Sequence, residues 1–193
     1  QPLEKLRGRL RQADRRLRQR GMRPQQRPHA VSLLAKQLVA RVFAPLDAPV
    51  KISLLRLRNR TGRKRRLTVT SYNEWVLGVS RASSAPYIIT EIDAPASTIF
   101  AKNPFNNEFA DRVAFAATSE RMLSATCDRK EFIGRNGSLD SPAAMKRVGL
   151  SGKDGAGLDP CGALQAPLEL GPGATAEIVF FLGEAASESA GAG

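Results

Sequence analysis

The residues best suited to chemistry gather in two polar stretches of the chain. The stretch Cys127–Leu139 is dense in charged, polar and glycine residues, and its candidates are Arg129, Glu131, Arg135 and Asn136. The stretch Lys102–Phe109 offers phenylalanines and three amides, Asn103, Asn106 and Asn107. Amide, guanidinium and carboxylate groups form directional hydrogen bonds with sugar hydroxyls, and aromatic rings stack on the apolar face of a pyranose. Both stretches therefore predict carbohydrate contacts, while loop-bracing hydrogen bonds remain an equal alternative for each residue.

A catalytic set is not found in this sequence. The single histidine, His29, lies in a basic segment without a Ser, Cys or acidic partner at a recognisable spacing. Glu91 and Asp93 would suit glycoside chemistry only if the fold held them about 5–10 Å apart across a sugar. The glycine-rich residues 152–162 lack the Walker and dinucleotide spacings, which favours a connecting loop. We expect no catalytic residue, no metal site and no cofactor.

The elements that would position these loops are short strands. Val50, Ile52 and Leu54 alternate with polar residues, and residues 67–76 are rich in Thr, Val and aromatics, so we predict a long antiparallel hairpin with the basic tip Arg60–Arg66. Further strands are predicted at 87–92, 98–101, 112–118, 122–126, 164–170 and 175–182, the last two joined by a turn at 171–173. Residues 30–43 fit a helix or a strand. The pattern predicts an all-β protein, an antiparallel β-sandwich.

Positive charge is confined to the N-terminal third of the chain. The net charge is +12, but residues 1–66 carry 20 Lys and Arg against three acids, whereas the remainder carries 10 against 15. Leucines spaced by three and four in residues 1–28 predict a basic, helical arm. A solvated arm and a solvated loop tip compete with a nucleic-acid-binding or anionic-membrane-binding module. Nucleic acid is disfavoured, because no aromatic residues interleave the basic residues of the arm.

Length and composition predict one principal domain. We expect a basic arm at 1–30, helical or disordered, a β-sandwich at 31–184, and a flexible tail or linker start at 185–193. No apolar run approaches the ~20 residues of a membrane span, and no secretory signal is recognised, so a cytoplasmic location is expected. The two cysteines, Cys127 and Cys161, are expected to be reduced.

An ordered series of motifs resembles the β-sandwich region of cyclic β-1,2-glucan synthases, which are related to cellobiose phosphorylase-type glycoside phosphorylases. The resemblance covers about residues 42–184. Its motifs are Pro45-Leu46-Asp47, Pro49-Val50-Lys51-Ile52, Leu57-Arg58-Asn59, Glu74-Trp75-Val76-Leu77-Gly78, Ala101-Lys102-Asn103-Pro104-Phe105-Asn106, Arg112-Val113-Ala114-Phe115, Glu131-Phe132-Ile133-Gly134-Arg135-Asn136-Gly137 and Gly155-Ala156-Gly157-Leu158-Asp159-Pro160-Cys161.

The resemblance implies a large "supersandwich" that precedes a helical barrel in the family. The barrel would carry the catalytic residues, and the sandwich would line a sugar cleft and contribute subunit contacts. The implied partners are a β-glucan or glucooligosaccharide, the helical barrel and a second copy in a homodimer; the parent enzymes are associated with the inner membrane. Family members have additional strands before the segment matching Val42, which leaves open whether this sandwich is complete and suggests a fragment. We therefore expect a noncatalytic carbohydrate-binding accessory domain, with a basic nucleic-acid or membrane-binding module as the alternative.

Overall fold

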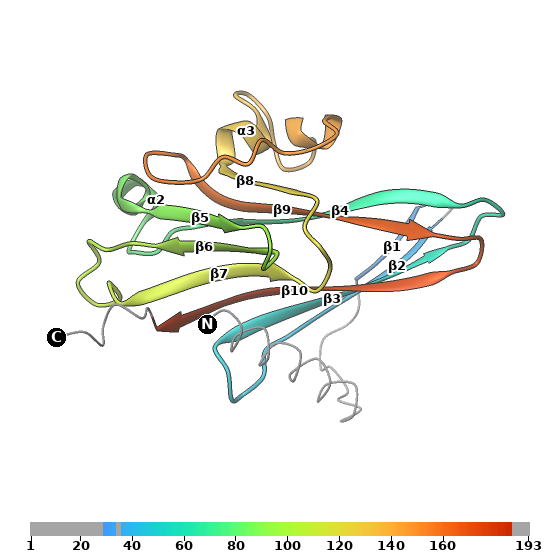
Figure 1. Ribbon diagram of the computed structural model, residues 1–193, viewed down its shortest axis with the longest axis horizontal. Coiled ribbons are helices and arrows are strands. Elements are labelled where there is room, and N and C mark those ends of the chain that lie inside the picture. The colour runs from blue at the N-terminus through green and yellow to red at the C-terminus, as the bar shows by residue number, and fades with distance from the viewer. Residues whose placement is uncertain (1–28, 34–35, 187–193) are drawn as a thin grey trace.

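Two antiparallel β-sheets pack face to face in the computed structural model, which describes residues 29–33 and 36–186 (Figure 1). The larger sheet has the strand order β1-β2-β3-β10-β7-β6-β5, and the smaller sheet has the order β4-β9-β8. The strands are β1 His29–Leu33, β2 Lys36–Phe43, β3 Val50–Asn59, β4 Arg65–Glu74, β5 Ile89–Asp93, β6 Thr98–Lys102, β7 Arg112–Thr118, β8 Ser124–Asp128, β9 Pro160–Leu170 and β10 Thr175–Ala186. The predicted all-β sandwich is confirmed.

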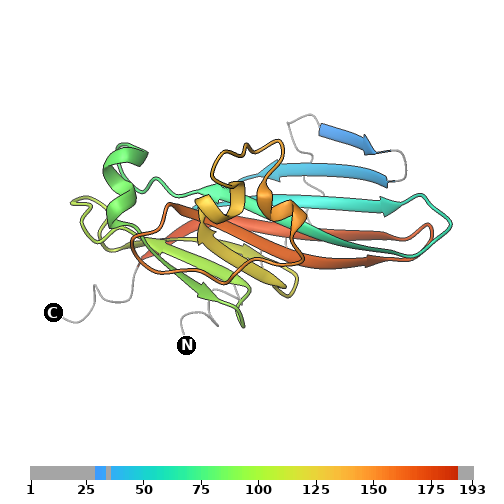
Figure 2. The same ribbon diagram turned by 90° about the horizontal axis from the view of Figure 1, so that it is seen from above.

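The predicted hairpin between β3 and β4 is wrong. β3 pairs with β2 and β10, whereas β4 pairs with β9, so the chain crosses from one sheet to the other in an arch. β9 and β10 form a second arch beside the first, and both arch loops lie at one end of the molecule (Figures 1 and 2). Period-two alternation shows only that each strand buries one face. It does not decide whether successive strands are sheet neighbours or face each other across the core.

The segment 30–43, which fitted a helix or a strand, is extended in its described parts, residues 30–33 and 36–43. β1 pairs with β2, and β2 pairs with β3 from Lys36 opposite Asn59 to Phe43 opposite Ile52. The β-branched residues at the end of this segment are typical of a strand, and pairing with β3 supplies its backbone hydrogen bonds. Residues 1–28 of the predicted basic arm and residues 187–193 of the predicted tail lie outside the described residues.

The smaller sheet is apolar on both faces. One face contributes Cys127 and Leu164 to the cluster between the sheets, together with Trp75 and Ile99. The other face contributes Cys161 to a second cluster beneath two short helices, α3 Arg129–Ile133 and η2 Ala143–Lys146. Both thiols are free and buried. Because they occupy opposite faces of one sheet, they are not placed to form a disulfide with each other.

Short helices occupy the remaining connections. α2 Arg81–Ser84 continues into η1 Ala85–Tyr87, with the Ser80 side chain capping α2. The Asp128 carboxylate caps α3 by accepting a hydrogen bond from the backbone N–H of Lys130 at 3.0 Å. None of the described helices has the length and apolar character that crossing a membrane requires.

Candidate functional site

A cleft of about 940 Å³ opens at the end of the sandwich opposite the arches. Its walls are the connection between β4 and β5, which contains α2 and η1, and the loop between β6 and β7. Its floor includes Arg112 and Ala114 of β7 and Glu184 of β10. Arg112 donates from Nη2 to the Glu184 carboxylate at 2.5 Å, so opposite charges cancel at the floor.

Aromatic side chains give the cleft an apolar surface. Tyr87 and Phe105 approach from opposite walls, with ring centroids 5.1 Å apart and planes tilted by 46°. Tyr87 is 47% exposed, Phe105 is 71% exposed and Phe109 is 51% exposed. Exposed aromatic residues grouped in a concave site are typical of ligand-binding surfaces.

The three amides predicted to contact sugar all line this cleft. Asn103 is buried; its Nδ2 donates to the Leu77 carbonyl at 2.9 Å and its Oδ1 accepts from the Phe105 backbone N–H at 3.1 Å. Asn106 accepts two backbone N–H bonds within its own loop, from Glu108 at 2.9 Å and Phe109 at 3.0 Å. Both amides thus fix the loop that presents the phenylalanines.

Asn107 differs from the other two amides. It is exposed on the rim of the cleft, and its side chain makes no hydrogen bond with the described residues. Its carboxamide therefore keeps two donor hydrogens and an acceptor oxygen for a ligand.

Arg129 lies away from this cleft, in a network of alternating charges. It donates from Nε to Glu74 at 2.8 Å and lies 3.6 Å from Asp159, and Arg81 pairs with the same two carboxylates. Burial acts to raise the pKa of Glu74, but the hydrogen bonds from Arg129 and Tyr72 outweigh it and the pKa is lowered. The network ties the ends of β4 and β9 to α2 and α3, which is a positioning role.

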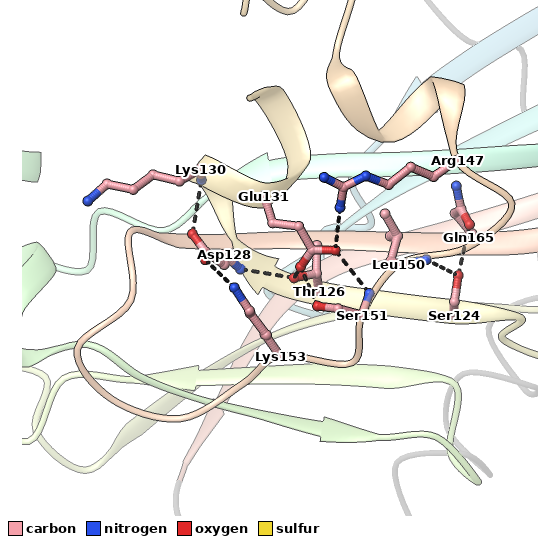
Figure 3. A network of polar contacts seen from close by, with 10 residues as sticks. All are labelled: Ser124, Thr126, Asp128, Lys130, Glu131, Arg147, Leu150, Ser151, Lys153 and Gln165. Atoms are coloured by element: carbon pink, nitrogen blue, oxygen red, sulfur yellow. Dashed lines mark hydrogen bonds and ion pairs between the residues drawn. The ribbon is translucent and has the colours of Figure 1, made fainter. Parts of the chain in front are cut away.

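Glu131 is buried at the centre of the network drawn in Figure 3. Its carboxylate accepts from Thr126 Oγ1 at 2.6 Å, from the Ser151 backbone N–H at 3.0 Å, from the Ser151 hydroxyl and from Arg147 at 3.2 Å. Burial acts to raise the pKa of Glu131, but the hydrogen bonds from Ser151 and Thr126 lower it below its usual value. This carboxylate joins β8 and α3 to the segment that contains Ser151.

Arg135 and Asn136 are exposed in the turn that follows α3. They line a shallow depression of about 400 Å³ together with Ser138 and Lys146. Gly137 is required in this turn, since a Cβ at that position would lie 2.0 Å from the Ile133 carbonyl oxygen. The structure thus divides the seven candidates between the cleft, which holds Asn103, Asn106 and Asn107, and the region around α3, which holds Arg129, Glu131, Arg135 and Asn136.

Sequence reasoning missed the second wall of the cleft. Leu77, Val79 and Tyr87 line it, and Val79 is fully exposed. Tyr87 was expected to begin a strand, but it ends η1, and the strand begins at Ile89. The signal for a helical turn was Pro86, which suits the first turn of a helix.

Comparison with known families matches residues 37–192 to the family described as Glycosyl hydrolase 94, supersandwich domain. The chain belongs to this family. The described part of the supersandwich contains no group of three or more His, Cys, Asp or Glu residues suited to holding a metal ion.

Two enzymes contain regions similar to this supersandwich. Cyclic beta-(1,2)-glucan synthase NdvB of Rhizobium meliloti (strain 1021) is 36% identical over 138 residues, which cover 71% of this chain and 5% of the synthase. Solabiose phosphorylase of Paenibacillus borealis is 32% identical over 139 residues, covering 69% of this chain and 18% of the phosphorylase. The chain therefore spans a small fraction of either relative.

A solved structure supports the fold alone. A polysaccharide lyase superposes with a TM-score of 0.51 at 10% identity, covering 84% of this chain and 22% of the lyase. The predicted resemblance to cyclic β-1,2-glucan synthases and glycoside phosphorylases is confirmed by the family match and by both relatives.

Proposed function

We propose that this supersandwich is a noncatalytic accessory domain of a β-glucan synthase or glycoside phosphorylase-type enzyme, and that its cleft contacts a β-glucan or glucooligosaccharide. The observation that carries the proposal is the pair of exposed rings, Tyr87 and Phe105, which pack against each other in the lining of the cleft, with the amide of Asn107 in the same lining. Aromatic faces cover the apolar C–H surface of a pyranose, and an amide satisfies its hydroxyls. Similarity to a glucan synthase and a disaccharide phosphorylase makes carbohydrate the natural ligand class.

The lowered pKa values of two carboxyl groups, those of Glu74 and Glu131, support a noncatalytic role. A general acid for glycosidic bonds needs a raised pKa, so that it is protonated near neutral pH. Glu74 and Glu131 have lowered pKa values, and each is held by hydrogen bonds from its neighbours. Bond cleavage or formation would then belong to the rest of the enzyme. In this proposal the helical barrel is a partner, and the sandwich contributes to contacts between subunits of a homodimer.

The proposal is tested by calorimetric titration with β-1,2-glucooligosaccharides. We expect Tyr87→Ala and Phe105→Ala each to weaken binding by about 2–13-fold, because stacking on an aromatic ring contributes about 0.5–1.5 kcal/mol beyond simple burial in comparable contacts. Leu139→Ala is the matched control: Leu139 is also exposed and apolar, but it lies outside the cleft. Equal affinities for the wild type, both aromatic variants and the control would contradict the assignment of the cleft.

A further inference from the structure

The end of β3 and the loop of the first arch carry more positive charge than the neighbouring acids can pair with. Residues 56–66 carry seven Lys and Arg, and the acids that pair with them are Glu169 and Glu177. Glu177 pairs with Arg56 at 2.5 Å, while Glu169 is shared by Lys64 and Arg66. Four arginines of residues 56–66 have no acidic partner among the residues that the structure describes: Arg58, Arg60, Arg63 and Arg65.

A buried asparagine holds the two arch loops together. Asn59 is 1% exposed, and its Nδ2 donates to the carbonyls of Arg63 at 2.8 Å, Leu170 at 3.1 Å and Gly171 at 2.9 Å. Its Oδ1 accepts from the Thr61 backbone N–H at 3.0 Å and from the Thr61 hydroxyl at 2.7 Å. The tip is therefore fixed, and its arginines extend from a preorganised backbone.

A polar depression of about 630 Å³ lies where the two loops meet. Arg58, Arg60, Gly62 and Gly173 line it, and both glycines face open space. The backbone N–H groups of these two glycines make no hydrogen bond with the described residues. Guanidinium groups beside unpaired loop amides are the donor set that binds phosphate oxygens.

We propose that this depression, the arch-tip site, binds a phosphate-class anion, with Arg58 and Arg60 as the principal charged donors. Residues 54–68 and 167–175 contain no aromatic side chain, so base stacking has no platform here and recognition rests on charge and hydrogen bonds. The arch loops whose residues line this site lie at the end of the molecule opposite α2 and the loop between β6 and β7 (Figure 2), so the site is independent of the carbohydrate proposal. The phosphate group belongs either to a small phosphorylated molecule or to the headgroup of an anionic lipid.

The test is a phosphate titration of the chain followed by amide NMR, with sodium chloride at equal ionic strength as the salt control. We expect saturable shifts of the Gly62 and Gly173 amide signals with phosphate. The Arg58→Gln/Arg60→Gln variant should bind phosphate at least about tenfold more weakly, since hydrogen bonds between charged groups are among the stronger hydrogen bonds in proteins. Arg121→Gln/Lys130→Gln removes two exposed cations elsewhere and should leave the shifts unchanged. The dispersion of the remaining amide signals reports that each variant is folded.

A vesicle-binding experiment distinguishes the two possible sources of the phosphate group, a small phosphorylated molecule and a lipid headgroup. Sedimentation with phosphatidylglycerol vesicles, compared with phosphatidylcholine vesicles, supports a lipid headgroup if it depends on Arg58 and Arg60. Shifts with free phosphate and no dependence of vesicle binding on these arginines support a small phosphorylated ligand. Three results would overturn the arch-tip site. Sodium chloride could reproduce the amide shifts, or the two double variants could lose the same phosphate affinity. The third result is no response to either phosphate or vesicles.

Discussion

Replacing Asn59 by Ala tests how the two arches are held together. The substitution removes two amide hydrogens that serve three carbonyl groups, and it removes the acceptor for the N–H and hydroxyl of Thr61. Each hydrogen bond contributes about 0.5–1.5 kcal/mol, and buried groups left unpaired add to the loss. We therefore expect the free energy of unfolding to fall by about 2–4 kcal/mol.

The assay is equilibrium unfolding in urea, followed by circular dichroism. With a slope of about 2 kcal/mol per M, the middle of the usual range, the expected loss moves the midpoint down by about 1–2 M. Asn107→Ala is the matched control, because Asn107 is an exposed loop asparagine whose side chain makes no hydrogen bond with the described residues. The control should change stability by less than about 0.5 kcal/mol. Equal midpoints for the two variants would refute the idea that Asn59 joins the arches.

Three further predictions concern charge, close packing and thiol burial. Because the pKa of Glu131 is lowered on folding, the ionised carboxylate stabilises the fold above the usual carboxyl pKa. This stabilisation is lost as the pH falls through the lowered pKa. Glu131→Gln should therefore make the urea midpoint decline less steeply below about pH 4.3. An unchanged acid decline would argue against this role. Gly162→Ala should cost about 1–3 kcal/mol, since the new Cβ would lie 2.8 Å from the side-chain oxygen of Asn73, while Gly62→Ala meets open space and should be neutral in the same assay. Burial raises the pKa of Cys127 to about 12 and also raises the pKa of Cys161, so a thiol reagent should react slowly with the native chain and fast in urea, and rapid native labelling would contradict the burial.

The strands were predictable because their alternation and turn residues are local signals. Residues 112–118 and 175–182 were predicted from sequence, and β7 and β10 occupy them. The partners of the strands were not predictable from the same signals. The short basic loop after Asn59 suited a hairpin, but the side chain of Asn59 supplies the loop carbonyls with hydrogen bonds that allow an arch.

The candidate site was predictable only where a loop carried both rings and amides. The loop with Phe105 and Asn107 does line the cleft, but the opposing wall with Tyr87 comes from a helical turn that had been assigned to a strand. Glu131 shows the other limit. Its charge suggested a ligand contact, whereas its burial depends on Ser151, a residue twenty positions away whose approach no local pattern encodes.

Carbohydrate is the proposed ligand of the cleft at the end of the supersandwich. The direct measurement is an amide NMR titration with β-1,2-glucooligosaccharides. The fluorescence of the single tryptophan, Trp75, would not report binding in the cleft, because Trp75 is buried between the sheets. We expect saturable shifts confined to residues 77–87 and 103–109, with the amide signals of Arg135 and Asn136 unchanged. Shifts absent from both cleft segments at saturating oligosaccharide, or confined to the turn after α3, would contradict this proposal.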